Sequence, residues 1–437
     1  MSPEKQRVRI VLPTHWDARQ LAACRARWEP AFDILFDEPS DDECSHRFPV
    51  LDYIDEVARG ARGGQDGVFS SSDYPGATVA AAIATRSGLP GPTARSVIAC
   101  GHKYYSRLLQ RDVVPEATPW FELVDPLHPR ADLPFPLFVK PVKGSFSQLA
   151  RRIDSFEDLE QFLARPATRE FFDFYMRIFD QMVEELSDFE LGGRYFLAEG
   201  ILSGEQTTVE GFVSDGEVVI LGVVDSILHP ATRSFIRFDY PSSLSIEVQE
   251  QMEGIARRII VASGLERSFF NVEMVHDPTS GATHILEVNP RICGQFGDLY
   301  EKVDGRNSYE MALELVTGRR PEVPRRAGAF ACAASVPLRT FRPARVQRVP
   351  TPERVREVEA AHPGMLTWIE CQEGQILSDF ELLEDGQSCR YAVVNLGAQG
   401  REDLLSRIET LEQDLGLVLE PWGEGGVTQM PLGEVIP

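Results

Sequence analysis

The chain has 437 residues, of which 43% are hydrophobic and 25% charged, and its formal net charge is -23. This length exceeds one ordinary hydrophobic core, so two to four domains are expected. The acidity argues against a nucleic acid or an anionic membrane as partner, because either would need a basic surface. The sequence contains no apolar run of roughly 20 residues that could span a bilayer, and its first residues do not form an apolar signal segment.

Seven cysteines are scattered singly at positions 24, 44, 100, 293, 332, 371 and 389, without Cys-x-x-Cys spacing. An odd number of isolated thiols fits a reducing cytoplasm better than a disulfide framework or a zinc site. The eight histidines form no His-x-x-x-His pair, so structural or surface roles are expected for them.

Residues 7–100 alternate short apolar runs with amphipathic stretches. This alternation predicts a parallel sheet covered by helices on both faces. The predicted strands are residues 8–12, 32–36 and 67–69, and the predicted helices are residues 17–27, 50–60 and 77–86. No Gly-x-Gly-x-x-Gly pattern follows the first strand, so a dinucleotide site is not expected there.

A Gly/Pro-rich stretch at residues 87–93 marks a domain boundary. One helix, Ala94–Gln110, is predicted after it and carries Lys103. A solvated helix lysine is the simple interpretation of that residue.

A strand predicted to end at Lys140 leads into a loop that contains Lys143, Ser145 and Ser147. A lysine in a buried strand is costly unless its ammonium meets an anion, and a loop of small residues with open amides can cradle a phosphate. The alternative is an edge strand that ends in a basic turn.

Further along, helices are predicted at residues 155–164 and 168–187, the second rich in aromatic residues that indicate core or lid packing. Strands are predicted at residues 196–202, 207–213 and 218–225. Residues 229–241 are predicted to be an irregular loop, in which Arg233 and Arg237 could hold a substrate carboxylate or be incidental surface arginines. A helix is expected to open at Ser245.

Residues 271–291 read as two strands joined by the turn at residues 277–281. If His276 pairs with His284, the register places Glu273 directly across from Glu287. Their Cβ atoms would then lie about 5 Å apart, which is destabilising for two like charges unless something positive lies between them. Strict alternation also places Ile285 on the same face as Glu287, with Leu286 and Val288 on the other.

Two carboxylates and the amide oxygen of Asn289 make a hard, incomplete oxygen ligand set of the kind that Mg²⁺ completes with water and nucleotide phosphates. Arg291 could then reach a phosphate or a carboxylate. The alternative is a solvent-facing hairpin whose acidic residues only keep it soluble.

After Arg291 a loop at residues 293–297 is predicted, then a helix from Tyr309 to Thr317 and a linker at residues 319–324. A last unit follows, with strands near residues 329–336 and 388–395 and a helix at residues 401–415, and it shows no catalytic constellation.

Four pieces stand in a fixed order: Val139-Lys140-Pro141 with its loop, Ala198-Glu199-Gly200-Ile201 followed by Glu205, Asn271-Val272-Glu273, and Leu286-Glu287-Val288-Asn289-Pro290-Arg291. This succession resembles the ATP-grasp superfamily, in particular its carboxylate-amine ligase (L-amino acid ligase-like) and biotin-carboxylase-like branch. The resemblance implies a multidomain α/β and α+β fold. Its expected parts are a Rossmann-like domain at 1–100, the ATP-grasp domain at 101–325 with a mobile lobe at about 134–222, and a small α+β domain at 326–437.

The resemblance also implies roles for individual residues. Nucleotide contacts are expected from Lys103, Lys140, Lys143, Ser145, Ser147, Glu199, Gly200, Ile201, Glu205 and Leu286. Metal ligands are expected at Glu273, Glu287 and Asn289, with Mg²⁺ or Mn²⁺ as the ion. Lys140 and Arg291 are the expected catalytic residues, and Arg233, Arg237, Arg291 and Gly294 are the candidate substrate contacts. One departure is the bulky Phe146 in a phosphate loop that is less glycine-rich than many in the superfamily.

Chemistry of this kind uses ATP to convert a carboxylate into an acylphosphate, which an amine then attacks to give an amide, with release of ADP and phosphate. The expected partners are therefore a small carboxylic acid and an amine, and a homodimer would be common for such a family. Biotin-carboxylase-like carboxylation is the alternative, although no Ala-Met-Lys-Met carrier motif follows. A nucleotide sensor without turnover is the third hypothesis.

Overall fold

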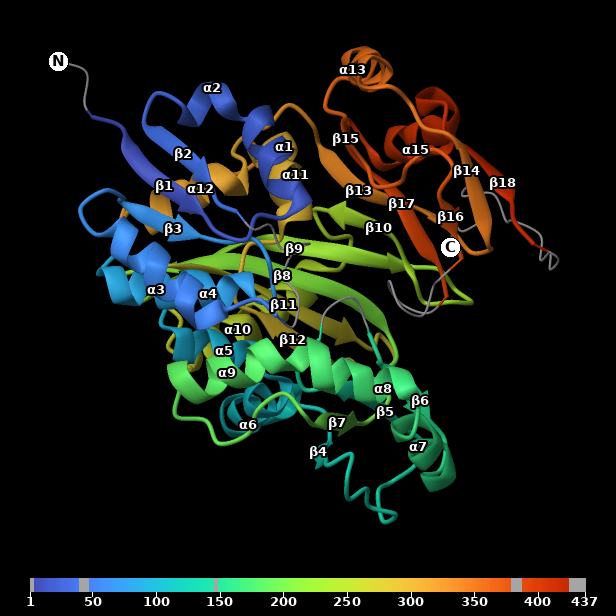
Figure 1. Cartoon of the computed structure of the whole chain (residues 1–437). Helices are drawn as coiled ribbons and strands as arrows, with labels where there is room; N and C mark the ends of the chain where they lie inside the picture. The colour runs from blue at the N-terminus through green and yellow to red at the C-terminus, as the bar shows by residue number, and fades with distance from the viewer. Residues whose placement is uncertain (1–3, 39–46, 145–147, 379–386, 424–437) are drawn as a thin grey trace. The chain divides into compact units, whose positions relative to one another are not determined.

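The computed structural model describes residues 4–38, 47–144, 148–378 and 387–423 (Figure 1). It is a mixed α/β multidomain fold, as expected. The chain forms two compact units. The first comprises Met1–Gly222, Leu244–Gly294 and Ser308–Glu322, and the second comprises Val223–Ser243, Gln295–Asn307 and Val323–Pro437.

The first unit begins with a parallel three-stranded sheet, as predicted, and the strand order is β2-β1-β3. Its elements are β1 (Gln6–Ile10), α1 (His15–Ala23), α2 (Arg25–Trp28), β2 (Phe32–Phe36), α3 (Val50–Ala61), β3 (Gly67–Phe69) and α4 (Gly76–Ser87). The single helix predicted at 17–27 is two helices with a break at Cys24. α12 (Ser308–Val316) returns to contact β3, as Figure 1 shows. A Cβ on Gly67 would lie 2.7 Å from the carbonyl oxygen of Val316, so this approach requires glycine.

The helix predicted at 94–110 is wrong as one piece, because it is broken at His102 into α5 (Ala94–Gly101) and α6 (Lys103–Val113). His102 is extended, with ψ of 101°. The backbone N–H of Lys103 donates to the carbonyl of Val142 at 2.7 Å instead of continuing the earlier helix. Tertiary hydrogen bonding therefore overrides a continuous helical pattern, and Lys103 becomes the first residue of α6. A short 3₁₀ turn, η2 (Pro115–Ala117), follows.

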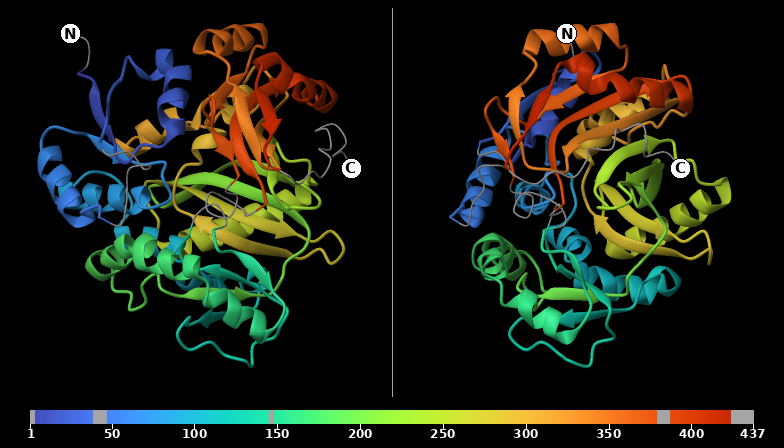
Figure 2. Two further views of the ribbon diagram at one scale, coloured as in Figure 1. Left: turned by 45° about the vertical axis from the view of Figure 1, so that its right-hand side comes forward. Right: turned by 90° about the vertical axis from the view of Figure 1, so that its right-hand side faces the viewer.

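A four-stranded antiparallel sheet of order β4-β7-β5-β6 follows in the same unit. Its strands are β4 (Phe121–Val124), β5 (Leu137–Pro141), β6 (Arg151–Ile153) and β7 (Phe196–Glu199). The helical segment beside it comprises α7 (Phe156–Leu163), α8 (Pro166–Glu170), the π-helical turn η3 (Phe171–Tyr175) and α9 (Met176–Leu186), so the helix predicted at 168–187 is interrupted. Both Figures 1 and 2 show this green segment alongside the strands. The ring of Phe196 packs against Phe162 and Phe172, which joins sheet and helices in one core.

The remaining strands of the first unit are β8 (Glu205–Ser214), the beginning of β9 (Glu217–Leu228), β11 (Ser268–His276) and β12 (Thr283–Asn289). β11 pairs with β8 on one side and with β12 on the other, antiparallel in both cases. α10 (Ile246–Ser263) leads into β11, and the side chain of Ser245 caps it by accepting from the N–H of Val248. That helix start is as predicted.

The second unit contains the end of β9, then β10 (Phe235–Tyr240), β13 (Cys332–Thr340), β17 (Cys389–Ala398) and β15 (Leu366–Ile369). It also contains η4 (Gly294–Phe296), α11 (Gly297–Asp304), α13 (Pro352–Ala361) and α15 (Arg401–Leu415), and a small sheet of β16 (Ile376–Leu377), β14 (Ala344–Arg348) and β18 (Val418–Pro421). Two expectations were wrong here. Residues 235–240 are a strand rather than irregular loop, because β10 pairs with both β9 and β13. The predicted loop at residues 293–297 is mostly the 3₁₀ turn η4, and the largely buried helix α11 that follows it was not predicted.

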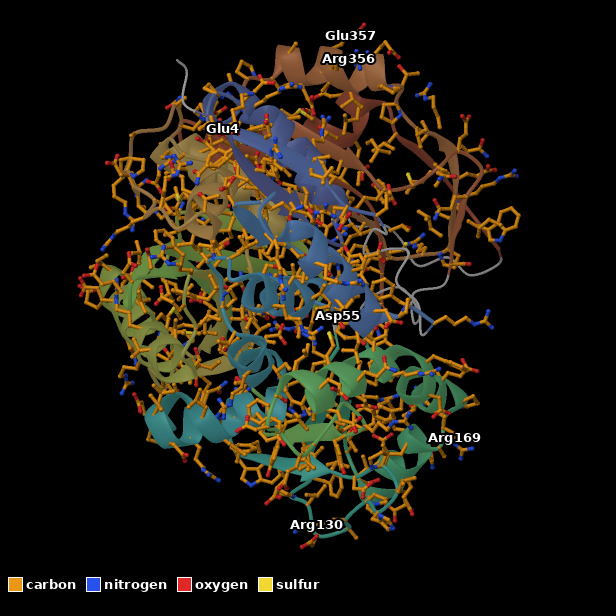
Figure 3. The ribbon with its side chains drawn as sticks, turned by 60° about the vertical axis from the view of Figure 1, so that its left-hand side comes forward. Glu4, Asp55, Arg130, Arg169, Arg356 and Glu357 are labelled. Carbon is orange, nitrogen blue, oxygen red and sulfur yellow. The ribbon has the colours of Figure 1, made fainter. Side chains whose placement is uncertain are left out.

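Many charged side chains lie on the surface. In Figure 3, Arg130 in the connection between β4 and β5 and Arg169 on α8 point away from the ribbon. Within the part of the chain that the structure describes, no helix has the length and apolarity needed to cross a membrane.

Candidate functional site

The hairpin of β11 and β12 brings the two predicted metal carboxylates face to face. Glu273 pairs directly with Glu287, as the predicted register requires. The outer part of that register was wrong, because His276 pairs with Thr283 and His284 pairs with Val275. A β-bulge between the two parts accounts for the difference.

The bulge contains Leu286, the one residue of β12 between Ile285 and Glu287 that has no partner in β11. A bulge inserts an extra residue and reverses the alternation of faces beyond it. Ile285 therefore lies opposite Met274 in the core, with 0% of its surface exposed, and not on the face of Glu287 as strict alternation predicted. Both requirements, an apolar Ile285 inside and Glu287 on the opposite face, are met only with this extra residue.

The amide of Asn289 lies between the two carboxylates. Its Nδ2 is 3.3 Å from Oε1 of Glu273 and 3.4 Å from Oε1 of Glu287, and it also contacts Asn271. Gln206 of β8 donates from Nε2 to Oε2 of Glu273 at 3.1 Å. A donor group thus occupies the space between two facing acids, where their mutual repulsion demands positive charge.

The pKa values of the two facing carboxyl groups are shifted in opposite directions. Burial and the neighbouring charge of Glu287 raise the pKa of Glu273. Burial opposes ionisation of Glu287 as well, but Lys103 and Lys140 outweigh it and lower the pKa of that carboxyl. Without a further cation, the pair therefore holds one negative charge more readily than two.

Lys103, at the start of α6, points to this pair. Its Nζ lies 3.2 Å from Oε2 of Glu287 and donates to the carbonyl of Gly144 at 3.1 Å. The break at His102 is what places Lys103 at a helix start beside the loop after β5. The interpretation of Lys103 as a solvated helix lysine is wrong, because its side chain is only 12% exposed.

Lys140, near the end of β5, is buried against the edge of the hairpin. Its Nζ lies 2.7 Å from Oε2 of Glu199 and donates to the carbonyl of Leu286 at 3.1 Å. Burial lowers the pKa of Lys140, and Glu199 opposes that effect. Burial also opposes ionisation of Glu199, but Arg107 and Lys140 outweigh it and lower the pKa of that carboxyl.

A second buried ion pair joins Lys143 to Asp73, which follows β3. The Nζ of Lys143 donates to Oδ2 of Asp73 at 2.8 Å, and Nε of Arg291 lies 3.9 Å from Oδ1 of the same carboxylate. Burial opposes ionisation of Asp73, but Lys143 and Arg291 outweigh it and hold its pKa well below the usual range. Burial tends to lower the pKa of Arg291, but Asp73 outweighs it and raises that pKa.

A polar pocket lies among these groups. Asp73, Lys103, Lys143, Glu287 and Asn289 line it, together with Cys100, Gly101, Ser106, Arg107, Gln110, Leu286 and Val288. The β11–β12 hairpin, the start of α6 and the loop after β3 thus meet around one cluster of positive and negative side chains in the first unit.

The residues predicted to contact the nucleotide at the end of β7 differ in their surroundings. The carboxylate of Glu199 is engaged by Lys140 and Arg107, and the N–H of Gly200 donates to the carbonyl of Trp120 at 3.1 Å. Ile201 is 43% exposed, and Glu205 is exposed at the start of β8. The N–H of Gly200 is therefore engaged within the protein, whereas the side chains of Ile201 and Glu205 are exposed at this edge. Ser145 and Ser147, together with Phe146, lie outside the described residues.

The residues predicted to contact the substrate also differ in exposure and in their partners. The carbonyl of Gly294 accepts from Nε2 of Gln20 at 3.0 Å, and a Cβ at Gly294 would lie 2.8 Å from Cβ of Trp16, so this glycine serves close packing. In the second unit, Arg233 is exposed with φ of 63°, and Nε of Arg237 donates to Oδ1 of Asp239 at 2.7 Å in β10.

The oxygen-rich hairpin fits a hard divalent cation. Two facing carboxylates and an amide that can present its oxygen instead of its nitrogen suit Mg²⁺, which takes its other ligands from phosphates and water. Among the described residues no group of three or more His, Cys, Asp or Glu side chains is arranged to hold a metal. Glu273, Glu287 and Asn289 would therefore form an incomplete set that needs a bound phosphate to complete it.

Two members of this cluster did not emerge from the sequence. Arg107 lies one helical turn after Lys103, a spacing that puts both residues on one face of α6. Asp73 follows a strand of a parallel sheet, at the carboxyl end where ligands of such sheets bind. Both signals were available, but neither was distinctive without knowledge of the fold.

Residues 133–298 match the family model of the ATP-grasp domain. A sequence comparison with curated proteins finds no match. Among solved structures, an L-amino acid ligase from Bacillus licheniformis matches with a TM-score of 0.70 and 16% identity, over 96% of this chain and 99% of that chain. An N5-carboxyaminoimidazole ribonucleotide synthetase (purK) in its ADP complex matches with a TM-score of 0.65 and 13% identity, over 94% and 97%. A biotin carboxylase from Campylobacter jejuni matches with a TM-score of 0.60 and 12% identity, over 96% and 92%.

Proposed function

Because this chain carries an ATP-grasp domain and the fold of ATP-grasp ligases, we propose that it is an ATP-dependent ligase. It activates a carboxylate, an amino acid or a related acid, as an acylphosphate and joins it to an amine. The products are an amide or peptide, ADP and phosphate.

The observation that carries this proposal is the pair of carboxylates facing each other across β11 and β12. Glu273 and Glu287 pair directly, and Lys103 and Lys140 lie beside them. Like charges directly opposite each other destabilise a hairpin, so a purely structural role would not favour this arrangement. Glu273, Glu287 and Asn289 would hold Mg²⁺, which would neutralise charge on the phosphate oxygens of bound ATP.

The cationic side chains would supply the rest of the phosphate contacts. Lys103, Lys140 and Lys143 would contact the nucleotide phosphates, and Arg291 would face the γ-phosphate and the substrate carboxylate. Phosphoryl transfer requires mainly that the reacting groups are positioned and that charge on the transferring oxygens is neutralised, and these residues fit that task. Leu286 is the proposed residue against the base and Glu205 the proposed ribose contact.

The proposed reaction has two steps. A carboxylate oxygen of the acid attacks the γ-phosphorus, and the bond to the bridging oxygen breaks so that ADP leaves. The amine nitrogen then attacks the acyl carbon, loses a proton and displaces inorganic phosphate. Lys140 and Arg291 hold the phosphoryl oxygens in the first step, and no side-chain nucleophile takes part.

Four further points belong to the same proposal. We keep the division into a domain at 1–100, the ATP-grasp domain at 101–325 with its lobe at 134–222, and a domain at 326–437. We place the enzyme in the cytoplasm, which the six described cysteines, none of them in a disulfide, support. Arg233 and Arg237 stay candidate substrate contacts, and a homodimer is the expected assembly.

The test of this function is a phosphate-release screen with MgATP against pairs of amino acids and related acids. A ligase should release phosphate and ADP only when an acid and an amine are both present, and mass spectrometry should find the amide. AMP release would contradict the proposal. Bicarbonate-dependent ADP release would assign a carboxylase instead, and ATP binding without turnover on any mixture would assign a sensor.

A variant pair connects the activity to the hairpin. Glu287→Gln should lower kcat at least a hundredfold, because it removes a charged metal ligand while keeping shape. Glu250→Gln, an exposed change on α10, is the matched control and should retain wild-type activity. Equal activity of the two variants would show that the facing carboxylates do not serve the reaction.

A further inference from the structure

A closed ring of buried charges lies behind the hairpin. Arg107 contacts Oε1 of Glu199 through Nε, and Lys140 contacts Oε2 of the same carboxylate at 2.7 Å. The carbonyl of Leu286 closes the ring, because it accepts from Nη2 of Arg107 at 2.8 Å and from Nζ of Lys140 at 3.1 Å. The ring joins α6, β7, β5 and β12, all within the first unit.

Arg107 is the most constrained member of this ring. It is 1% exposed and stands first among the largest fully buried side chains of the described residues. Each of its three guanidinium nitrogens has a partner: Glu199, Leu286 and Oε1 of Gln110. Gln110 is fixed in turn, because its Nε2 donates to Oγ of Ser106 at 2.9 Å.

The carbonyl that Arg107 holds belongs to the bulge. Leu286 is the unpaired residue of β12, so its backbone is not fixed by β11. The next residue is Glu287, and the backbone conformation of the bulge determines whether its side chain faces Glu273. The charge-assisted hydrogen bonds that Arg107 and Lys140 donate to the Leu286 carbonyl therefore hold the backbone of the bulge in place.

Stability alone explains such a ring poorly. Taking a guanidinium, an ammonium and a carboxylate out of water costs about as much as their attraction returns, and apolar replacements of equal shape are often as stable. A precise geometric requirement is a better reason to keep them. Arg107 also lines the pocket that Lys103, Glu287 and Asn289 share.

We infer that Arg107 is a positioning residue for the metal-nucleotide site, a role that deepens the proposed ATP-dependent function and rests on it. Through the Leu286 carbonyl it sets the bulge that turns Glu287 toward Glu273. Through Glu199 it orients the ammonium of Lys140. Its three guanidinium nitrogens all have partners within the protein, so it acts through those partners. Glu199 accordingly acts in this ring through its side chain instead of reading a base with it.

The test is calorimetric binding of MgADP to the full chain and its variants. Arg107→Met should weaken MgADP binding about 10- to 100-fold, the usual loss when a residue that orients metal ligands is removed. Arg107→Lys should recover part of this loss, because an ammonium can reach Glu199 or Leu286 but does not have the planar fork that bonds both. Arg111→Met, one turn later and exposed, is the matched control and should bind within twofold of wild type.

A second measurement separates positioning from simple structural support. ADP binding is compared with Mg²⁺ and with EDTA, well below the unfolding midpoint of each variant. A positioning role predicts that the affinity gained from Mg²⁺ falls in Arg107→Met and returns in part in Arg107→Lys. A structural role would lower only the unfolding midpoint, and unchanged Mg²⁺ dependence in both Arg107 variants would overturn the inference.

The outcome for the wild-type chain distinguishes the two proposals. If the wild type binds MgADP and the Arg107 variants bind it equally well, the positioning role is wrong and the ligase proposal stands. If the wild type itself has no affinity for MgADP, the proposed function is wrong and the inference falls with it.

Discussion

Lys103, Lys143 and Arg291 each carry a positive charge next to an acid in the candidate site. Lys103 contacts Glu287, and Asp73 lies between Lys143 and Arg291. Burial lowers the pKa of Lys143, and the carboxylate of Asp73 opposes that effect, because a neighbouring negative charge favours the ammonium form. The cost of burying the cations is thus offset before any phosphate binds.

His102 is the residue whose protonation state matters for the fold around Lys103. Its Nε2 lies 3.1 Å from the carbonyl of Gly192, and its Nδ1 is buried without a hydrogen-bond partner. Burial lowers the pKa of His102 to about 4. The neutral imidazole with its proton on Nε2 therefore suits this position, and a second proton on Nδ1 would meet no acceptor.

A pH dependence of stability follows from the lowered pKa of His102. Above the ordinary pKa of about 6.5, His102 is neutral in both the folded and the unfolded chain, so its titration does not reduce the free energy of unfolding. As pH falls, the unfolded chain takes up a proton that the folded chain refuses until about pH 4, so folding weakens by about 2 kcal/mol at pH 5. Urea unfolding at pH 7 and pH 5 measures the loss.

His102→Gln tests that assignment, because glutamine can donate to Gly192 but does not titrate. The difference in unfolding free energy between pH 7 and pH 5 should shrink by about 2 kcal/mol in this variant. His128→Gln, at a largely exposed imidazole, is the control and should keep the wild-type pH dependence. An unchanged difference in His102→Gln would show that another group causes the loss.

At the scale of elements, the start of β8 depends on one glycine. Gly204 has φ of 137°, and Glu205 after it pairs with His276 at the end of β11. A Cβ at Gly204 would lie 2.2 Å from the carbonyl oxygen of His276. The chain can enter β8 at this point only because glycine has no side chain.

Gly204→Ala should therefore destabilise the protein by about 3 kcal/mol, since both the backbone angle and the contact oppose a side chain. Gly254→Ala, in the exposed face of α10 with nothing within 4 Å of its Cβ, should instead stabilise it by about 0.5 to 1 kcal/mol. Urea unfolding midpoints compare the two variants. Equal effects of the two substitutions would refute the argument from close approach.

On the scale of the whole molecule, the acidic chain concentrates buried cations at one place. The net charge is -23, yet Lys103, Arg107, Lys140, Lys143 and Arg291 gather around the β11–β12 hairpin in the first unit. These cations lie among the carboxylates of Asp73, Glu199 and Glu287 in one confined cluster, which does not create the extended basic face that a nucleic acid needs. This contrast fits a nucleotide substrate.

Binding of that nucleotide should stabilise the fold by mass action. With MgATP at a hundred times its dissociation constant, the free energy of unfolding should rise by about 2.7 kcal/mol, and the thermal midpoint should rise by a few degrees. ATP with EDTA should raise the midpoint less, because the facing carboxylates then repel the phosphates. Thermal unfolding followed by circular dichroism measures both shifts, and equal shifts with and without Mg²⁺ would argue against a metal at the hairpin.

The sequence determined what depends on neighbours along the chain. Turn residues and alternation define the hairpin itself, although the pairing of Glu273 with Glu287 also requires the bulge at Leu286. The cap at Ser245 and the strands at residues 32–36 and 67–69 follow from local patterns of the same kind. The order of weak motifs indicated the ATP-grasp fold, and residues from these motifs, Lys140, Glu199, Leu286 and Glu287, lie close together in the structure.

The tertiary structure decided what depends on distant partners. The bulge at Leu286, the helix break at His102 and the strand β10 all arise because hydrogen bonds to remote segments outweigh local preference. Arg107 and Asp73 joined the site for the same reason: their partners lie far away in sequence, so their positions after Lys103 and after β3 were not distinctive along the chain. Periodicity reports which face of an element is apolar, but only packing decides which charges meet.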